Sequence, residues 1–477
     1  MHRNYVGGEW VESHNARRNE NPSDLDDVIG DFAQADVDQT ELAISMARDA
    51  QPIWANAGIQ ARASALDFIG AELLARSADL GELLSREEGK TLAEGIAEVS
   101  RAGQIFKFFA GEALRMRGDS VDSVRPGIDV EMRREPLGVV GIITPWNFPI
   151  AIPAWKIAPA LAYGNSVVFK PAELVPASAW ALAEIISRSG VVNGAFNLVM
   201  GRGSIVGETL SNSRKIAGLT FTGSTETGKR LLTRASECMT RIQLEMGGKN
   251  PLVVLDDADL DNAVDCAIQG AFFSTGQRCT ATSRIIVERS VHDRFVERLK
   301  NAMRALRVGH ALDPQTHLGP AADESQLRTD LEYVEIGKAE GATLALGGEL
   351  LKRETRGHFI SPALFTNATP DMRIAREEIF GPVACTLVAD DFEHAMVLAN
   401  DSPFGLTAGI CTTSLAKATH FKRNIQSGMA MVNVPTAGVD YHVSFGGTKA
   451  SSYGAREQGH HAKEFFTKTK TAYTYAL

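Results

Sequence analysis

The sequence predicts an α/β protein built on doubly wound parallel sheets. Two observations support this fold class. From residue 138 onward, short β-branched runs alternate with helical stretches, and a second series of the same kind begins near residue 251. Strands that alternate with helices in this way form βαβ units, whose strands run parallel. We therefore expect two α/β units that follow each other along the chain.

The region before the first unit is expected to be mainly helical. Residues 38–57, 61–75 and 91–116 carry apolar side chains at a spacing of three to four, which is typical of amphipathic helices. Residues 128–133 then alternate between apolar and polar, and residues 134–138 (Arg-Glu-Pro-Leu-Gly) suit the turn of a hairpin.

The two α/β series define the remaining predicted elements. In the first series the expected strands are 138–144, 166–170, 196–200 and 218–222, and the expected helices are 176–189, 205–211 and 227–235. In the second series the expected strands are 251–255 and 284–288, and the expected helices are 259–273 and 291–306. The tail, 465–475, is rich in Thr and Tyr and therefore has strand character.

Composition excludes several classes of protein. The 477 residues carry 49 basic and 58 acidic side chains, a net charge of −9, with no basic block, so we expect neither nucleic-acid nor membrane binding. No apolar run approaches the roughly 20 residues that span a bilayer, and the N-terminus lacks a signal core. Five cysteines without a CxxC pair predict no disulfide framework and no metal site. We expect a cytoplasmic protein.

A glycine-rich segment after the predicted strand 218–222 resembles a P-loop. Residues 223–230 read Gly-Ser-Thr-Glu-Thr-Gly-Lys-Arg, and Arg230 lacks the hydroxyl that would bind magnesium. A turn from strand to helix at Gly223 and Ser224 presents backbone N–H groups, which suits a pyrophosphate. An ordinary strand-to-helix turn is the alternative. Because no G-x-G-x-x-G occurs, any dinucleotide must be held in a non-standard way.

A cation and a carboxylate end the predicted strand 166–170. Lys170 and Glu173 lie where a strand's carboxyl end can grip ribose hydroxyls. A solvated Lys/Glu pair on a loop is the alternative.

Cys279 is the cysteine whose context differs from the other four. It follows the predicted helix 259–273 through a turn that contains glycine, and Arg278 precedes it. A neighbouring cation can raise the thiolate fraction of a cysteine. The sequence around the other four cysteines is typical of packing in a helix or a strand. A packing role is the alternative for Cys279 as well.

Further motifs supply partners for such a nucleophile. Glu245 precedes two glycines and can act as a base toward water, although a surface carboxylate is the alternative. Asn147 ends the motif Pro145-Trp146-Asn147 after a predicted strand, and its amide can donate to an oxyanion. Glu378 belongs to the motif Glu-Glu-Ile-Phe-Gly-Pro at residues 377–382.

With these motifs the chain resembles the NAD(P)-dependent aldehyde dehydrogenase superfamily over essentially its whole length. Both of that family's most specific stretches, Glu-x-Gly-Gly-Lys and Phe-x-x-x-Gly-Gln-x-Cys, are present in full. The resemblance implies that Cys279 attacks an aldehyde, that Asn147 and the Cys279 N–H hold the oxyanion, and that hydride leaves for the nicotinamide. Glu245 would then activate the water that hydrolyses the thioester.

The resemblance also implies cofactor contacts. They comprise Lys170 and Glu173 at the adenosine ribose, Gly223 and Ser224 at the pyrophosphate, and Trp146, Glu378 and Phe380 at the nicotinamide. Because the Glu173 carboxylate should repel a 2′-phosphate, we expect a preference for NAD, with NADP possible.

The C-terminal region departs from the common family pattern. Ser444-Phe445-Gly-Gly replaces Pro-Phe-Gly-Gly, and residues 449–457 also differ. Together with Arg278 this resembles the branch that oxidises α-ketoglutaric semialdehyde (2,5-dioxopentanoate), with succinic or glutaric semialdehyde as alternatives. We expect Arg278 to bind the substrate's far carboxylate, with Ser444 and Phe445 beside it. A structural Arg278 is the competing interpretation.

The resemblance implies three structural parts. They are a cofactor-binding domain (1–117 and 137–247), a catalytic domain (248–446) and a β oligomerisation element (118–136 and 464–477) of a homodimer or homotetramer. Rival interpretations are a CoA-acylating relative, which would lack Glu245, a thiol hydrolase or esterase without a redox step, and an inactive scaffold.

Overall fold

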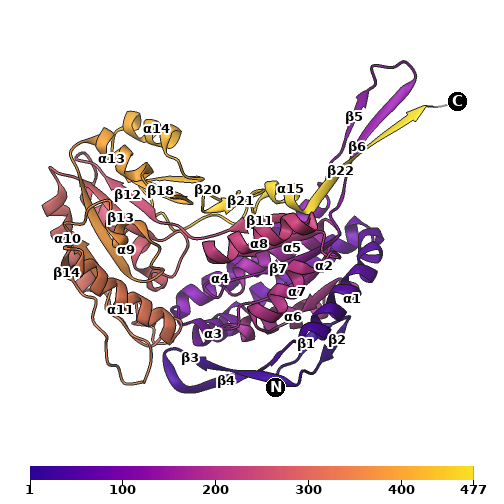
Figure 1. Ribbon diagram of the computed structural model, residues 1–477, viewed down its shortest axis with the longest axis horizontal. Helices are drawn as coiled ribbons and strands as arrows, with labels where there is room; N and C mark the ends of the chain where they lie inside the picture. The colour runs from indigo at the N-terminus through magenta and orange to yellow at the C-terminus, as the bar shows by residue number, and fades with distance from the viewer. Residues whose placement is uncertain (476–477) are drawn as a thin grey trace.

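Two mainly parallel sheets, each covered by helices on both faces, form the body of the molecule, and a narrow β arm projects from it (Figure 1). The computed structural model describes residues 1–475. Residues 476–477, the end of the predicted oligomerisation element, lie outside the described residues. Within the described part, no helix is both long and apolar enough to span a bilayer.

The first sheet has eight strands in the order β2-β1-β9-β8-β7-β10-β11-β21. In this order they span Glu9–Val11, Asn4–Val6, Phe196–Leu198, Ser166–Lys170, Val139–Ile143, Gly218–Thr222, Arg241–Glu245 and Ser452–Tyr453. The five strands from β9 to β11 are parallel, and β1 and β21 join them antiparallel.

Helices cover both faces of this sheet because successive strand residues point to opposite sides. Val140 and Ile142 pack into one core, and Val139 and Ile143 pack into another. The first core is shared with α2 (Ile59–Ala75), α3 (Ser77–Glu88), α4 (Leu92–Ala113), α5 (Ala151–Ala162) and α6 (Pro176–Ser187). The second is shared with α1 (Val37–Asn56), α7 (Glu208–Asn212) and α8 (Thr225–Cys238).

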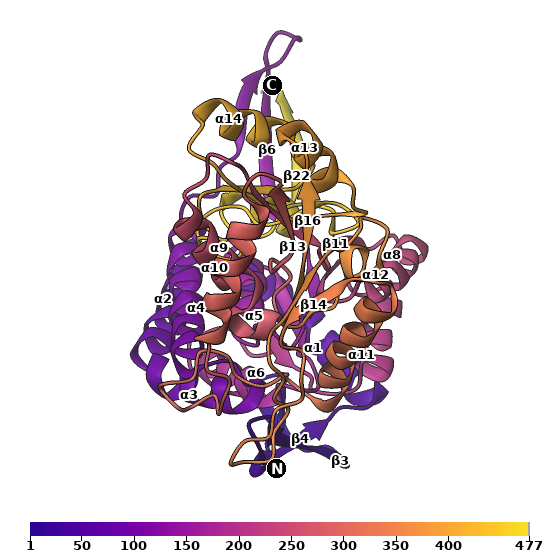
Figure 2. The ribbon, with the colours of Figure 1, turned by 90° about the vertical axis from the view of Figure 1, so that its left-hand side faces the viewer.

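The second sheet has seven strands in the order β14-β15-β16-β13-β12-β18-β19. They span Thr343–Leu346, Ala363–Thr366, Val383–Ala389, Thr282–Glu288, Asn250–Val254, Thr407–Cys411 and Met429–Val432. Helices α9 (Leu260–Ala271) and α10 (His292–Arg304) pack on one face. On the other lie α11 (Glu324–Ala339), α12 (Arg373–Arg376), α13 (Phe392–Asn400) and α14 (Leu415–Asn424) (Figure 2).

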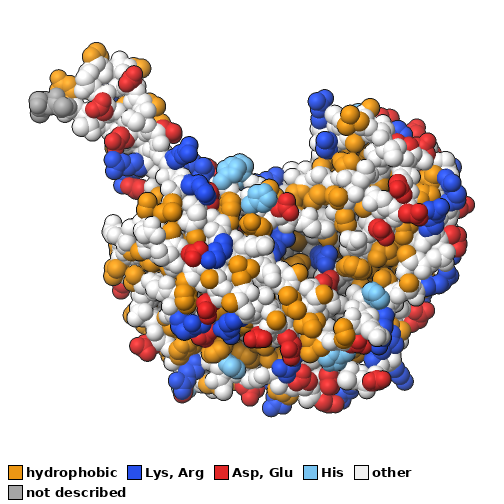
Figure 3. All heavy atoms as spheres, turned by 180° about the vertical axis from the view of Figure 1, so that it is seen from behind, with side chains coloured by type: hydrophobic (Ala, Val, Ile, Leu, Met, Phe, Trp, Pro, Cys, Tyr) orange, Lys and Arg blue, Asp and Glu red, His pale blue; other side chains and the backbone are white. Residues whose placement is uncertain are grey.

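The arm is a three-stranded antiparallel sheet, β22-β6-β5, that projects clear of the body (Figures 1 and 3). Its strands span Thr467–Tyr475, Ile128–Pro136 and Asp119–Asp122. The turn predicted at residues 134–138 is wrong. Strand β6 continues to Pro136, where it pairs with Thr467, and the hairpin turn lies between β5 and β6.

Smaller elements complete the chain. Strands β3 (Asn15–Asn21) and β4 (Asp24–Gln34) form one ribbon, β17 (Phe404–Gly405) and β20 (Thr448–Lys449) form another, and α15 (Lys463–Phe466) precedes β22. The helix expected at 205–211 starts as a π-helical turn, Gly203–Gly207, which continues into α7. The predicted domain boundary after residue 247 falls in the link between β11 and β12, and the domain assignment stays a prediction.

Candidate active site

The candidate nucleophile lies at the junction where the chain passes from the first sheet to the second. Glu245 is the last residue of β11 in the first sheet, and Asn250 is the first residue of β12 in the second. Cys279 precedes β13 of the second sheet, and Asn147 follows β7 of the first. The link 246–249 therefore carries the chain from one sheet to the other directly beside the nucleophile.

A strained turn delivers Cys279 to this position. After α9, a short 3-10 turn (Phe273–Gly276) holds Ser274 and Thr275 at φ values of 51° and 55°, followed by Gly276 at 67°. Only glycine adopts such values without cost. The Asn250 amide fixes the far side of the turn by donating to the carbonyl of Cys279 at 2.8 Å. The glycine-containing turn predicted before Cys279 is thus present.

A glycine is also needed where the link 246–249 passes the backbone of Cys279. A Cβ atom on Gly248 would lie 2.9 Å from the carbonyl oxygen of Cys279, which is closer than real Cβ contacts come. The second glycine of the Glu-Met-Gly-Gly-Lys stretch therefore lets β12 approach the nucleophile.

Electrostatics keep the resting Cys279 thiol protonated. Burial, with the carboxylates of Glu378 and Glu245 nearby, raises the pKa of Cys279 to about 12. The sequence suggested that Arg278 raises the thiolate fraction. The structure does not support this, because burial and the carboxylates of Glu378 and Glu245 raise the pKa of Cys279 and the Arg278 guanidinium is held by Glu94.

Glu245 is a buried carboxylate, and only 2% of its surface is exposed. Burial and the neighbouring Glu457 raise its pKa well above the ordinary value. The Ser452 hydroxyl donates to one of its oxygens. Behind it, the Lys156 ammonium is bonded to Glu457 and donates to the Thr220 hydroxyl at 2.7 Å. Glu245 is thus a base that is easily protonated, and the buried Lys156–Glu457 ion pair lies behind it.

Asn147 is buried and fixed at both its backbone and its side chain. Its Nδ2 donates to the carbonyl of Gln277 at 3.0 Å, and its own carbonyl accepts from Lys90 Nζ at 2.7 Å. An amide nitrogen has two hydrogens, so this bond leaves one N–H of Asn147 for another acceptor.

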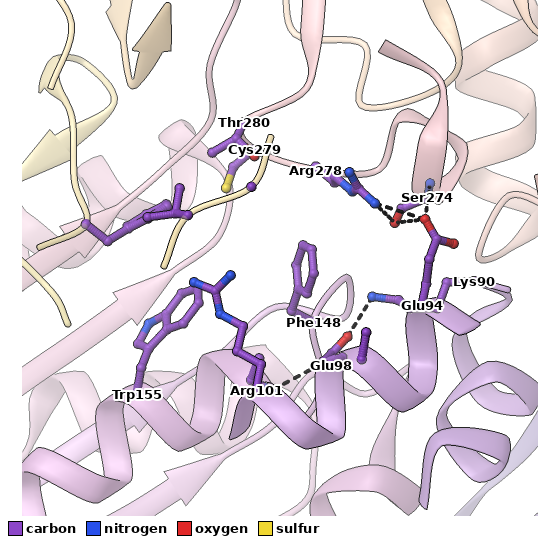
Figure 4. Close-up of a pocket in the computed structure, with 15 residues that line it drawn as sticks. Lys90, Glu94, Glu98, Arg101, Phe148, Trp155, Ser274, Arg278, Cys279 and Thr280 are labelled. Carbon is purple, nitrogen blue, oxygen red and sulfur yellow. Dashed lines mark hydrogen bonds and ion pairs between the residues drawn. The ribbon is translucent and has the colours of Figure 1, made fainter. Parts of the chain in front are cut away.

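A cavity of about 220 Å³ opens in front of Cys279. One face of α4 forms its floor, because Glu94, Ala97, Glu98 and Arg101 are spaced at i, i+3, i+4 and i+7. Aromatic side chains from α5 and the loops complete the wall: Phe148, Trp155 and Phe445. Trp155 and Phe445 stack with ring centroids 5.4 Å apart. Figure 4 shows Cys279 facing this floor across the cavity.

The predicted substrate residues are only partly brought together. Phe445 and Arg278 line the cavity. The Arg278 guanidinium, however, points to Glu94 at 2.9 Å and to the Ser274 hydroxyl at 2.7 Å (Figure 4). Ser444 does not line the cavity, and its hydroxyl is bonded to His461.

A second, larger groove of about 880 Å³ lies at the carboxyl ends of β7, β8 and β10. From β7 the chain proceeds through β8 to β9 on one side and later through β10 to β11 on the other. Ligands of doubly wound sheets bind at such a reversal of strand order. Trp146, Lys170, Glu173, Gly223 and Ser224, which the resemblance assigns to the cofactor, all line this groove.

The polar groups of this groove are arranged for a bound ligand. The Ser224 side chain caps α8 at the turn that resembles a P-loop. The Thr144 and Thr222 hydroxyls lie on the groove wall, buried without a hydrogen-bond partner among the described residues. Such groups are costly unless a ligand or water satisfies them. The groove therefore fits a polar, extended molecule such as a dinucleotide.

Charged groups at the groove's outer end are already held. Glu173 accepts from the Gly203 N–H at 2.9 Å and pairs with Arg17 at 3.0 Å. Lys170 donates to the Pro171 carbonyl at 2.8 Å, and burial lowers its pKa to about 8.

At the inner end, between groove and cavity, the Phe380 ring meets the Trp146 ring edge to face at 5.5 Å. Glu378 accepts from the Gly248 N–H at 3.0 Å, and burial raises its pKa to about 7. The structure thus places Glu378 against the link that carries Gly248, close to Cys279.

Comparisons with known proteins show the family to which the chain belongs. The aldehyde dehydrogenase family model matches residues 10–472. The chain belongs to the aldehyde dehydrogenase family.

This membership and the shared fold confirm the predicted family, fold class and enzyme class. The chain is 41% identical to α-ketoglutaric semialdehyde dehydrogenase of Bacillus subtilis, covering 98% of this chain and 97% of the relative. It is 41% identical to 2,5-dioxopentanoate dehydrogenase of Saccharolobus solfataricus, covering 95% of both. Betaine aldehyde dehydrogenase of Staphylococcus aureus in complex with NAD+ superposes with a TM-score of 0.97 at 35% identity, covering 100% of this chain and 95% of that chain.

Several residues of this family member's site were missed by the sequence analysis. Lys156 and Glu457 lie behind Glu245, and Arg101, Glu94 and Glu98 lie on α4. A usable signal was present on α4, because three charged residues share one face of a helix that is otherwise apolar there. Charges on the buried face of a helix indicate either ion pairs or a site.

Proposed function

We propose that this aldehyde dehydrogenase family member uses NAD+ to oxidise a short aldehyde that carries a carboxylate, α-ketoglutaric semialdehyde first among them. The observation that supports the reaction is the meeting of Cys279, Glu245 and Asn147 between the cavity and the groove. The names of the relatives from Bacillus subtilis and Saccharolobus solfataricus support the substrate.

The reaction begins at the Cys279 sulfur. Its proton passes to a neighbouring carboxylate, for which Glu245 is placed, and the sulfur attacks the aldehyde carbon. The free N–H of Asn147 and the backbone N–H of Cys279 receive the oxygen that becomes negative. Because Asn147 is held at both ends, this donor is positioned before the substrate arrives.

When bound, NAD+ supplies the two-electron acceptor that the side chains of this site lack. Lys170 and Glu173 would hold its adenosine ribose, and Gly223 with Ser224 its pyrophosphate at the N-terminus of α8. Trp146, Glu378 and Phe380 would position the nicotinamide end.

Glu245 completes the cycle. The oxidised substrate is a thioester on Cys279. Glu245 releases to solvent the proton that it took from the sulfur, and the ionised carboxylate then takes a proton from water, which attacks that thioester. The acid leaves and the Cys279 thiol is restored. A buried base next to the sulfur favours water over CoA as the acyl acceptor.

The substrate's far end needs a cation in the cavity. Arg278 is one candidate, but its guanidinium is shared between Glu94 and Ser274, so its role toward the carboxylate stays a prediction and is weakened by this pairing. Succinic and glutaric semialdehydes are alternatives that differ in chain length.

The projecting arm supports a proposal on assembly. Strand β22 is exposed along nearly its whole length, and the arm's edge strands have unpaired backbone groups, which in proteins commonly pair with another chain. We propose a homodimer or homotetramer. Light scattering after size exclusion tests this, and a monomer at micromolar concentration would contradict it.

An aldehyde panel tests the function. We expect α-ketoglutaric, succinic and glutaric semialdehydes to be oxidised with NAD+, measured as NADH absorbance, and NADP+ to be used less well. Cys279→Ala should lower the rate on the order of 10⁴-fold or more. Parental activity in that variant, or ester hydrolysis with no cofactor requirement, would contradict the mechanism. An NADP+ preference of about tenfold or more would contradict the cofactor assignment.

A further inference from the structure

The side chains that line the cavity in front of Cys279 carry unequal numbers of positive and negative charges. Three cationic side chains line it, Lys90, Arg101 and Arg278, against two carboxylates, Glu94 and Glu98. Lys90 Nζ pairs with Glu98 at 2.7 Å, and Arg278 pairs with Glu94 at 2.9 Å. Lys90 Nζ also lies 3.9 Å from the buried carboxylate of Glu88. Both carboxylates that line the cavity are therefore paired, and the lining cation that remains without an ion pair is Arg101.

Both carboxylates of these pairs accept further hydrogen bonds, although the Arg278 Nε is buried without a partner among the described residues. Besides Lys90, Glu98 accepts from the backbone N–H groups of Ile150 and Ala151 at 3.0 and 3.1 Å. Besides Arg278, Glu94 accepts from the N–H and the hydroxyl of Ser274 at 2.8 and 2.9 Å. Breaking either ion pair would leave a buried charge and several hydrogen-bond donors without partners. These groups therefore stay in place and form a fixed part of the cavity wall.

Arg101 carries the remaining charge. Among residues 1–475, no carboxylate lies within 4.0 Å of its guanidinium, and its Nε is buried without a partner. Its one side-chain hydrogen bond runs from Nη2 to the Gln458 amide oxygen at 3.3 Å. Figure 4 shows the side chain rising from α4 into the cavity beside Trp155, on the side that faces Cys279.

We propose that Arg101 binds the far carboxylate of the substrate and thereby selects monoanionic semialdehydes. This inference rests on the proposed function, because it assumes that the aldehyde carbon lies at Cys279. A carboxylate would supply the ion-pair partner that the guanidinium lacks. Arginine suits this task, since its planar fork binds a carboxylate by two parallel hydrogen bonds.

The same placement disfavours cationic aldehydes. The cavity has the aromatic side chains Phe148, Trp155 and Phe445, and an aromatic wall of this kind can hold a quaternary ammonium group. Here the Arg101 guanidinium lies 5.9 Å from the centroid of the Trp155 ring. It occupies that face and would repel a second cation. We therefore expect betaine aldehyde to be a poor substrate, even though betaine aldehyde dehydrogenases share the fold.

Arg101→Met tests the proposal, because methionine keeps an apolar stem on Trp155 and removes the charge. The readout is the ratio of kcat/KM for α-ketoglutaric semialdehyde to that for pentanal, an uncharged aldehyde. We expect this ratio to fall roughly 10- to 100-fold, because KM for the carboxylated substrate rises. The kcat/KM for betaine aldehyde should increase relative to that for α-ketoglutaric semialdehyde. Arg101→Lys, which keeps the charge without the fork, should recover part of the ratio.

Two comparison variants locate the effect. Arg115→Met removes an exposed arginine just beyond α4 that pairs with Glu112, and the ratio should not change. Arg278→Met should lower rates on both substrates together, because it loosens the turn before Cys279. A selective loss in Arg278→Met, with an unchanged ratio in Arg101→Met, would overturn the proposal and favour Arg278 as the anchor.

A second measurement needs no variant. Butyrate should inhibit the wild-type enzyme competitively against the semialdehyde, and its neutral analogue butyramide should inhibit at least about tenfold less. Equal inhibition by the two would contradict a carboxylate site even if Arg101→Met does not fold. A wild-type protein that oxidises no aldehyde contradicts the proposed function itself, whereas a wild-type protein that ignores the substrate's charge contradicts only this inference.

Discussion

The cofactor groove and the cavity in front of Cys279 adjoin each other but are built from different parts of the chain. The groove is made by turns at the carboxyl ends of β7, β8 and β10, with small residues and backbone N–H groups at its turns. The cavity is floored by one face of α4 and walled by aromatic side chains. In the groove Glu173 is held by Gly203 and Arg17. In the cavity Arg101 is the lining cation that has no ion pair among the described residues.

This difference separates two tasks. The part of the groove made of strand ends and backbone changes only with the fold, so it suits a ligand common to many enzymes. The side chains that line the groove can be replaced singly. A cavity made of side chains on a helix changes with single substitutions and leaves the sheet intact. Substitutions in the groove should therefore change cofactor use, and substitutions on α4 should change aldehyde preference.

The largest effect is expected where the two regions meet. Glu245→Gln removes the base that activates water and should lower steady-state turnover by roughly 10²- to 10⁴-fold. The acyl group should then accumulate on Cys279, and intact-protein mass spectrometry of enzyme mixed with aldehyde and NAD+ would detect it. Glu237→Gln, an exposed glutamate on α8, is the matched control. An acyl-free variant that turns over normally would place the base elsewhere.

The pH profile should report the same carboxylate. Burial and Glu457 raise the pKa of Glu245, and only the ionised form can accept a proton from water, so kcat should rise as pH increases through that pKa. Glu457→Gln removes the negative neighbour and should move the rising limb to lower pH. A profile of kcat between acidic and mildly alkaline pH measures this, and a shift to higher pH would contradict the assignment.

A groove substitution should change cofactor choice alone. Glu173→Gln removes the carboxylate that would repel a 2′-phosphate, and Arg17, which now pairs with it at 3.0 Å, becomes available to that phosphate. We expect the NADP+/NAD+ ratio of kcat/KM to rise about tenfold. The preference among aldehydes should stay as in the wild type. A change in aldehyde preference would break the separation between groove and cavity.

The smallest effect is expected at the start of the cavity floor. Thr91 caps α4 and forms a reciprocal capping box with Glu94. Thr91→Ala should lower the free energy of unfolding by about 1 kcal/mol, measured by chemical denaturation. Thr91→Ser keeps the hydroxyl and should lose much less. Equal losses in the two variants would show that the methyl group, not the cap, carries the stability.

The groove was predictable from the sequence because its residues come directly after strands, and those strands can be recognised from their short runs of β-branched and apolar residues. Strands 166–170 and 218–222 were predicted at their observed bounds, since each is a short run rich in β-branched residues and buried throughout. The turn at Gly223 and the pair Lys170 and Glu173 come directly after them. Their proximity follows from parallel strands that end at one edge.

The cavity was less predictable because its contacts join distant parts of the chain. The sequence placed Arg278 next to Cys279 and suggested that it acts on thiol and substrate, but Glu94, 184 residues away, holds its guanidinium. Arg101 stands in an ordinary helical pattern and carries no motif. The prediction of a hairpin turn at 134–138 was wrong for the same reason. Strand β6 continues through residues 134–136 and pairs there with the distant strand β22.

That pairing has a consequence for how the chain matures. Strand β6 runs from Ile128 to Pro136, and its partner β22 spans Thr467–Tyr475, so most of the protein separates them. During synthesis the N-terminal residues emerge first, and β6 must wait with one side uncovered until β22 has been translated. Truncated products from a stalled ribosome would therefore expose this strand, and they are the species in which we expect self-association and degradation to begin.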